Sequence, residues 1–200
     1  MLQLCVLLKD RKLNRLNGYD YSREGWYFVT IDCLKMYPWF GKIMIVGTGQ
    51  CPVRTDKINN CPIRTTIKLN DLGLVAEKYW KNISNVYNDV VLDKFVIMPN
   101  HVHGIIQVVG TGQCPVRTRN EIGQCPVRTD NNNPYRYGKL SKIINGYKNI
   151  VTKEIRSSSG ENEFAWQRSF YDEIIRNENS LQRIRKYIIE NPKNFLKSKL

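Results

Sequence analysis

One repeated phrase divides this chain and decides which parts of it can build a core. The phrase reads GTGQCPVRT in its intact form. Intact, partial and decayed copies lie at 47–55, 60–65, 110–118 and 123–130. They are too short, too polar and too irregularly spaced for stacked solenoid units, and their Gly, Thr, Pro, Asn and Asp residues are typical of loops. We therefore interpret about 47–66 and 110–133 as insertions in surface loops, where extra length costs little.

Without the two repeat blocks, roughly 157 residues remain, which is enough for a single domain. The chain has 31 Lys and Arg against 18 Asp and Glu, a formal net charge of +13, and most of that excess lies outside the blocks. This charge favours a polyanionic partner, with nucleic acid ahead of an anionic membrane surface. No apolar run approaches the roughly 20 residues that span a bilayer. The initial MLQLCVLL has its charges after it, the wrong order for a secretory signal, so we expect an intracellular protein.

The cysteines predict neither a disulfide framework nor a structural zinc site. In a reducing compartment disulfides rarely persist, and no pair here has the C-x2-C or C-x4-C spacing of zinc ligands. The six are Cys5, Cys33, Cys51, Cys61, Cys114 and Cys125. The four in the repeats leave two interpretations open, disordered loops or Cys-Pro motifs that bind a metal or a partner.

Residue patterns outside the repeats predict four strands and three helices. The strands are expected at 26–33, 91–98, 102–109 and 163–168, and the helices at about 70–83, 137–156 and 180–190. Pro99-Asn100 indicates an antiparallel turn or one bent strand, and Pro192 is expected to end the last helix. The order of elements predicts an α+β fold, with a ferredoxin-like antiparallel sheet and helices packed on one face.

The candidate chemistry begins with the two histidines of the chain, His101 and His103, in MPNHVHGII. On a strand, residues two apart project from the same face, so both imidazoles can bind one metal ion while Val102 packs on the other side. An H-x-H pair alone also fits two unrelated polar strand residues.

Tyr187 and Asn191 are four residues apart, and therefore share one face of the last predicted helix. An Asn oxygen could complete a His2Asn metal site, and a metal or a base beside Tyr187 could assist deprotonation of its phenol. The alternative is that Tyr187 borders the core and Asn191 caps a helix ended by Pro192.

Four longer segments carry a resemblance to a known family: GYDYSREGWYFVT (18–30), DKFVIMPNHVHGII (93–106), LSKIINGYKNIVTKEI (140–155) and WQRSFYDEIIRNENSLQRIRKYIIENP (166–192). Together they resemble the REP-associated tyrosine transposases, of the single-tyrosine HUH transposase superfamily. The resemblance covers nearly the whole chain except the two repeat blocks.

The resemblance implies a single catalytic domain, spanning 1–200, that nicks and joins single-stranded DNA near imperfect palindromes through a 5′-phosphotyrosine link. It implies that His101 and His103 bind a divalent metal, Mg²⁺ or Mn²⁺, that Tyr187 is the nucleophile and that Asn191 is the third ligand. Two imidazoles by themselves favour Mn²⁺ or a later transition metal. Tyr171 is the runner-up nucleophile, although the residue four positions later is Ile175, which cannot bind metal.

Further expectations concern DNA contacts, assembly and location. Basic residues would neutralise phosphates, and Tyr19, Tyr21 and Trp26 could stack on bases. The basic candidates are Arg11, Lys12, Arg15, Lys139, Lys142, Arg183 and Lys186. Family members are often dimers, so a homodimer is a further expectation, in a cytoplasmic, nucleoid-associated prokaryotic protein with no membrane partner.

The repeats themselves suggest a hypothesis about the gene. Thr-Gly-Gln-Cys-Pro-Val can be encoded by ACAGGGCAATGCCCTGTN, in which ACAGGGCA and TGCCCTGT are reverse complements. The protein repeats would then be translated copies of a mobile palindromic element. The insertions also leave two other interpretations open: a catalytically inactive hairpin-binding protein of the same fold, and a metal-binding or scaffold protein that acts through the Cys-Pro loops.

Overall fold

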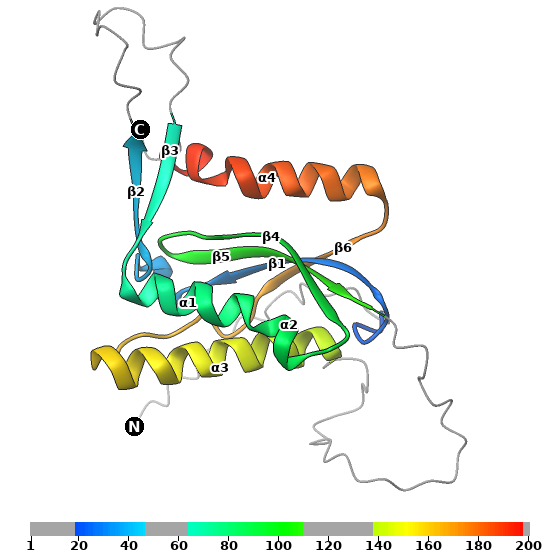
Figure 1. The fold of residues 1–200 in the computed structure, drawn as a ribbon, viewed down its shortest axis with the longest axis horizontal. Coiled ribbons are helices and arrows are strands. Elements are labelled where there is room, and N and C mark those ends of the chain that lie inside the picture. Colours follow the sequence, from blue (N-terminus) through cyan, green and yellow to red (C-terminus); the bar gives the residue numbers. More distant parts are fainter. Residues whose placement is uncertain (1–18, 47–63, 110–137, 198–200) are drawn as a thin grey trace, which may run out of the picture.

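A four-stranded antiparallel sheet is the centre of the computed structural model, which describes residues 19–46, 64–109 and 138–197 (Figure 1). Its strands lie in the order β4-β5-β1-β6. Their bounds are β1 Gly25–Asp32, β4 Val90–Ile97, β5 His101–Val108 and β6 Tyr171–Ile175. Helices stand between β1 and β4 and between β5 and β6, which gives the ferredoxin-like split βαβ arrangement. The predicted α+β class and antiparallel sheet are confirmed.

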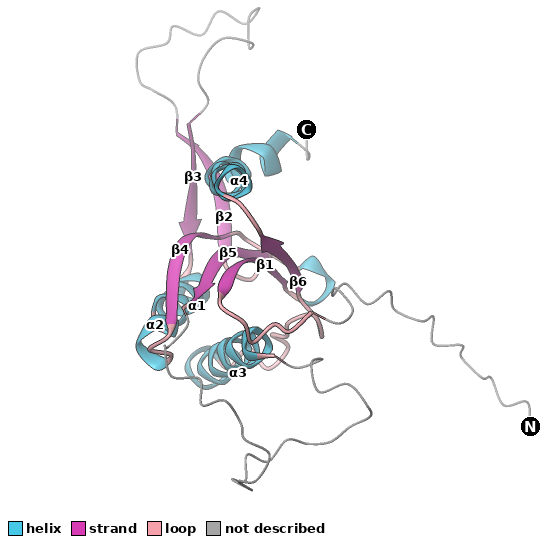
Figure 2. Cartoon of the chain, turned by 90° about the vertical axis from the view of Figure 1, so that its right-hand side faces the viewer, coloured by secondary structure: helices cyan, strands magenta, loops and turns pink. Residues whose placement is uncertain are grey.

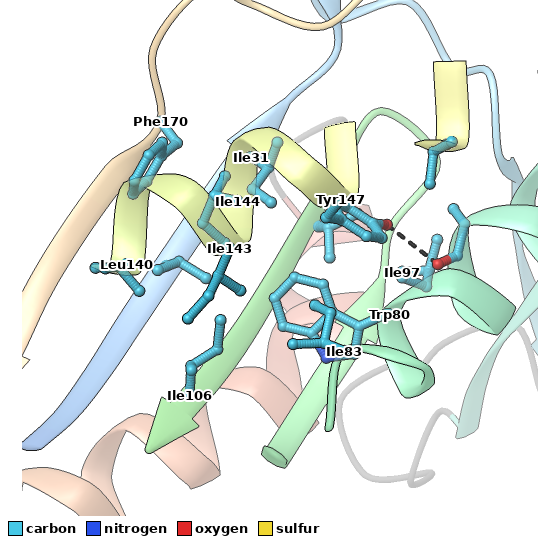
Figure 3. Packing of buried hydrophobic residues seen from close by; sticks show 14 of the residues in the cluster. Ile31, Trp80, Ile83, Ile97, Ile106, Leu140, Ile143, Ile144, Tyr147 and Phe170 are labelled. Carbon is cyan, nitrogen blue, oxygen red and sulfur yellow. Dashed lines mark hydrogen bonds between the residues drawn. The ribbon is translucent and has the colours of Figure 1, made fainter. Parts of the chain in front are cut away.

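The first face of the sheet is covered by α1 (Asp71–Lys81), α2 (Ile83–Val86) and α3 (Lys139–Ser159). Ile143 and Ile144 of α3 belong to one buried cluster with Trp80 of α1 and Ile106 of β5 (Figure 3). The Tyr147 hydroxyl donates a hydrogen bond of 3.1 Å to the carbonyl of Ala76, which ties α3 to α1. This face therefore holds the larger part of the core.

The opposite face is covered by α4 (Glu178–Lys197), as Figure 2 shows. Leu181, Ile184 and Ile188 of α4 form a second buried cluster with Phe28 of β1 and Ile105 of β5. The prediction of helices on one face is therefore corrected to helices on both. The reason lies in β5, which is buried on both sides and carries Ile105 on one face and Ile106 on the other, so both faces of the sheet must be covered.

A charged contact fixes where α4 lies across this second face. Arg185 Nε donates to Asp93 Oδ2 of β4 at 2.7 Å, and its guanidinium stands 5.9 Å from the ring centre of Trp26. The side of α4 that carries Arg185 therefore faces β4. The side that carries Tyr187 faces β1, where its ring meets Phe28.

The predicted strand at 163–168 is wrong. In that segment Trp166 forms an isolated bridge with Cys33, and the last strand is β6, which begins at Tyr171. Lys148 of α3 donates to the carbonyls of Gln167 and Ser169 at 2.9 and 3.0 Å. A buried lysine thus satisfies two carbonyls that a strand would have offered to a neighbour.

The predicted end of the last helix at Pro192 is also wrong, because α4 continues through Pro192 to Lys197. A proline removes one helical hydrogen bond, but packing on both sides of it holds this helix to the sheet. Asn191 is buried, and the ring of Phe195 lies 6.1 Å from that of His101. Asn191 is therefore inside a helix and not a terminal cap.

A hairpin that the sequence pattern did not predict follows β1 and the short 3-10 helix η1 (Leu34–Met36). Its strands, β2 (Gly41–Val46) and β3 (Arg64–Leu69), pair antiparallel beside the main sheet. Residues 64–66, assigned above to the first insertion, begin β3. The rest of that block, the block at 110–133 and the MLQLCVLL segment lie outside the described residues. The prediction of one domain with two insertions stays a prediction.

Among the helices of the described part of the chain, none is both long and apolar enough to cross a membrane.

Candidate active site

The two histidines lie side by side at the start of β5, on the face that α4 covers. Pro99 and Asn100 form a tight turn between β4 and β5, closed by a 2.8 Å hydrogen bond from the Met98 N–H to the His101 carbonyl. The antiparallel alternative for this segment is therefore the observed one. The imidazole rings of His101 and His103 are 4.5 Å apart between centres and are only 7% and 5% exposed, while Val102 packs in the core on the other face.

Each imidazole is oriented by a polar neighbour at Nδ1. His101 Nδ1 lies 2.7 Å from Asn100 Oδ1, and because an amide oxygen only accepts, Nδ1 of His101 carries the proton. Asn100 is oriented in turn by a 3.3 Å bond from its Nδ2 to the carbonyl of Met36. His103 Nδ1 lies 2.8 Å from Oγ1 of Thr30, its cross-strand neighbour on β1. Partners of this kind are typical of histidines that bind a metal through the other ring nitrogen.

Tyr187 and Asn191 come to the histidines from α4. The Tyr187 hydroxyl is 3.5 Å from His103 Nε2, and its ring stands edge-on to Phe28 at 6.0 Å. The Asn191 side chain is 7% exposed and hydrogen-bonds the His101 side chain. The structure thus brings together four of the residues that the sequence singled out.

Tyr171, the runner-up nucleophile, lies on the same face but farther from the histidine pair. It pairs with Thr30 of β1, and its ring meets Phe28 edge-on at 6.4 Å. Of the two candidate tyrosines, Tyr187 is the one whose hydroxyl is within 3.5 Å of a histidine nitrogen.

Burial keeps the histidine pair neutral. Loss of water lowers the pKa of His101 to about 4 and that of His103 to about 3, and the charge of His101 lowers the pKa of His103 further. Both rings are therefore uncharged at neutral pH, the state that a metal ligand requires. No cluster of three His, Cys, Asp or Glu side chains suited to a metal occurs in the described ranges. A metal bound here would take its third protein ligand from an amide, as Asn191 would provide.

The basic residues predicted to contact DNA lie in different parts of the chain. Arg11, Lys12 and Arg15 lie outside the described residues. Lys139 and Lys142 are on α3, on the far face of the sheet, where Lys139 forms an ion pair with Asp89. They do not line the site.

The expectation that Tyr21 stacks on a base is corrected. Tyr21 is 3% exposed and packs in the core against Tyr19 and Tyr27 on the α3 side. No face of its ring is open to a base. Trp26 is packed against the α4-side core beneath Arg185.

Arg183 and Lys186 are the two predicted cations that share a helix with Tyr187, and both are exposed. Lys186 reaches Glu190 at 4.0 Å.

Sequence reasoning missed Thr30, Phe28 and Asn100 as parts of the site. Thr30 and Phe28 alternate along the WYFVTIDC strand with the core residues Tyr27 and Val29, which is a signal for a second buried face. Asn100 directly precedes His101, but its bond to Met36 depends on η1, which is distant in sequence.

The chain was compared with protein families, with solved structures and with other protein sequences. No family model matches the chain. Among solved structures, a REP-associated tyrosine transposase bound to a REP hairpin aligns with a TM-score of 0.47 and 13% identity, over 90% of this chain and 73% of that one. A proposed transposase from Deinococcus radiodurans aligns with a TM-score of 0.37 and 12% identity, over 89% of this chain and 98% of that one. Likenesses this distant assign no function.

A much stronger match is to an uncharacterized protein of Haemophilus influenzae, which is 34% identical over 189 residues. The alignment covers 92% of this chain and 89% of the other. The chain therefore belongs to the same protein family as this Haemophilus influenzae protein.

Proposed function

We propose that this chain is a metal-dependent, single-stranded DNA endonuclease and strand transferase, a transposase that acts at palindromic sequences. The observation that carries the proposal is the position of the Tyr187 hydroxyl, 3.5 Å from Nε2 in a buried pair of neutral histidines. The net charge of +13 supports a polyanionic substrate. The resemblance of four long segments to REP-associated tyrosine transposases supports the reaction type.

His101, His103 and Asn191 would hold the divalent ion, Mg²⁺ or Mn²⁺. The donor set fits such an ion in two respects: both imidazoles are neutral, and the Nδ1–H tautomer of His101 is fixed by Asn100. Since the set has no carboxylate, phosphate oxygens of the DNA would supply the balancing negative charge. When bound, the ion polarises the scissile phosphate and stabilises charge on its oxygens.

Tyr187 performs the covalent step. Its phenol oxygen attacks phosphorus, an O–P bond forms, and the bond from phosphorus to the 3′-oxygen breaks. The phenol proton leaves to solvent and the departing 3′-oxygen takes one up. Because the phosphotyrosine bond retains the energy of the phosphodiester bond, no nucleotide cofactor is consumed. The edge contact with Phe28 limits the rotation of the ring, which keeps the oxygen on the side of the histidines. Attack by a 3′-hydroxyl on the phosphotyrosine joins strands by the reverse step.

The test is a covalent-adduct assay with single-stranded oligonucleotides that carry an ACAGGGCA/TGCCCTGT hairpin between randomised flanks, in the presence of Mn²⁺. A 5′-phosphotyrosine link requires that a 3′ label moves with the protein on a denaturing gel and that a 5′ label does not. Tyr187→Phe should form no adduct, whereas Tyr171→Phe should still form one. The opposite pattern would make Tyr171 the nucleophile and overturn the assignment.

The same assay separates the competing functions. Wild-type protein that binds the hairpins without forming any adduct would be the inactive hairpin-binding protein of the same fold. Wild-type protein that ignores DNA, together with an isolated repeat peptide that binds zinc on titration, would favour a role for the Cys-Pro loops.

Assembly and location are further parts of the proposal, and they are taken from the family resemblance. A homodimer predicts twice the chain mass in size-exclusion chromatography with light scattering. A nucleoid-associated protein predicts fluorescence of a tagged chain that overlaps the DNA stain.

A further inference from the structure

Tyr171 is an exposed aromatic residue on the site face that the proposed reaction does not use. It is the first residue of β6, its side chain is 45% exposed, and its ring touches Phe28 edge-on. A tyrosine ring that is open to solvent beside a reaction centre is available to stack on a base of the substrate.

The strand register places Tyr171 in line with the histidine pair. Tyr171 is directly opposite Thr30 of β1, and Thr30 is directly opposite His103 of β5. Residues opposite one another share a face of the sheet, and neighbouring strands are about 4.8 Å apart. The backbone of Tyr171 therefore lies roughly 10 Å from that of His103, two strands away. At this spacing, the nucleotide next to a phosphate held at the histidines is within reach of β6.

Charge decides which part of that nucleotide faces Tyr171. Glu173 is two residues along β6, on the same face and partly exposed, so a phosphate here would be repelled. The cations near Tyr187, Arg183 and Lys186, are on α4. A strand would thus turn its phosphates toward α4 and its neutral, flat bases toward β6.

We propose that the Tyr171 ring is a stacking platform for the nucleobase next to the phosphate that Tyr187 attacks. The inference rests on the proposed function, because it needs single-stranded DNA at the histidine pair. Aromatic rings stack on any base, so the platform orders the strand without reading its sequence.

The surroundings of Tyr171 also disfavour a nucleophilic role for it. Partial burial raises the pKa of its phenol, and the charges of Glu173 and Asp172 raise it further, which keeps the hydroxyl protonated. On β6 it is followed four residues later by Ile175, which is buried in the α4-side core and has no ligand atom to offer.

The experiment measures binding with Mn²⁺ in chains that all carry Tyr187→Phe, so that a phosphate can be held at the histidines while no adduct forms. Hairpin oligonucleotides carry a single-stranded tail with 2-aminopurine at each tail position in turn, and affinity is read from the anisotropy of a separate dye. Tyr171→Ala should weaken binding roughly 5- to 100-fold, as expected for the loss of one stacked base. It should also abolish the quenching of 2-aminopurine at one tail position, which Tyr171→Phe should restore.

Tyr79→Ala is the matched control, because Tyr79 is on α1, on the opposite face, where its hydroxyl bonds Glu154. Circular dichroism and thermal melts of each variant separate a binding defect from unfolding. Folded Tyr171→Ala that binds and quenches like its Tyr187→Phe parent would overturn the platform. Binding and quenching by the parent, with no adduct from wild type in Mn²⁺, would overturn the proposed reaction and leave Tyr171 as a stacking contact for bound DNA. Wild-type protein that binds no tail would overturn both.

Discussion

Acid should destabilise this protein through its two buried histidines. In the folded chain the pKa is about 4 for His101 and about 3 for His103, chiefly because burial removes water, against 6.5 for an exposed histidine. The unfolded chain therefore takes up protons first as the pH falls below 6.5. The stability that the neutral pair contributes is fully present above pH 6.5 and is lost as the pH falls toward the folded values.

The size of this effect follows from the pKa differences. At pH 5 both histidines of the unfolded chain are almost fully protonated, whereas those of the folded chain are still mainly neutral. Each histidine then lowers the free energy of unfolding by about 2 kcal/mol relative to pH 7.5, since one pH unit corresponds to about 1.4 kcal/mol per proton. About 4 kcal/mol for the pair is a large share of the roughly 5–15 kcal/mol that stabilises a typical domain.

Urea unfolding in EDTA at pH 7.5, 6.5, 5.5 and 5.0 measures this loss. Wild-type protein should lose about 4 kcal/mol more between pH 7.5 and pH 5.0 than the double variant His101→Gln/His103→Gln, which has no imidazole to protonate. Carboxylates titrate alike in both proteins and cancel in the comparison. Equal losses in the two proteins would refute the claim that these rings are buried and neutral.

Three further predictions concern the packing of β5, the orientation of the proposed metal ligand His101 and the gene sequence of the repeats. Gly104→Ala should destabilise the protein by roughly 1–3 kcal/mol in urea unfolding, because a Cβ there overlaps the Trp80 indole, and Trp80→Phe in the same chain should recover part of the loss. Asn100→Ala should weaken Mn²⁺ binding about 10- to 100-fold by calorimetry, because it frees the His101 ring. Sequencing the gene should find ACAGGGCA and TGCCCTGT in both intact repeats, and codons that break the inverted repeat would exclude the palindromic origin.

Most of the fold could be predicted from sequence because its strands and helices carry strong patterns. The apolar periodicity of 137–156 corresponds to α3, and the helix predicted from about 70 corresponds to α1, where Asn70 is the N-cap and accepts a 2.9 Å bond from the Gly73 N–H. The errors arose where tertiary contacts outweigh local preference. Lys148 holds the chain at Gln167 and Ser169 out of any strand, and packing of α4 carries the helix past its proline.

Local sequence patterns could predict only part of the candidate site. Two histidines with period two share a strand face, and Tyr187 and Asn191 share a helix face, whatever the rest of the chain does. The bond from Thr30 to His103 instead depends on the register between β1 and β5, and a slip of one residue would turn Thr30 away from it.

Tyr187 and Asn191 reach the two histidines only if α4 lies on the histidine face of the sheet. An amphipathic helix buries its apolar stripe against whichever sheet face is apolar, and here both faces are, so the pattern of α4 alone did not select one. The selection comes from Phe28 and Ile105, which give the histidine face its own apolar cluster, and from Asp93, which holds Arg185. Were α4 on the α3 side, the sheet would separate Tyr187 from His103. The chemistry proposed for this chain therefore depends on the face of the sheet that α4 covers.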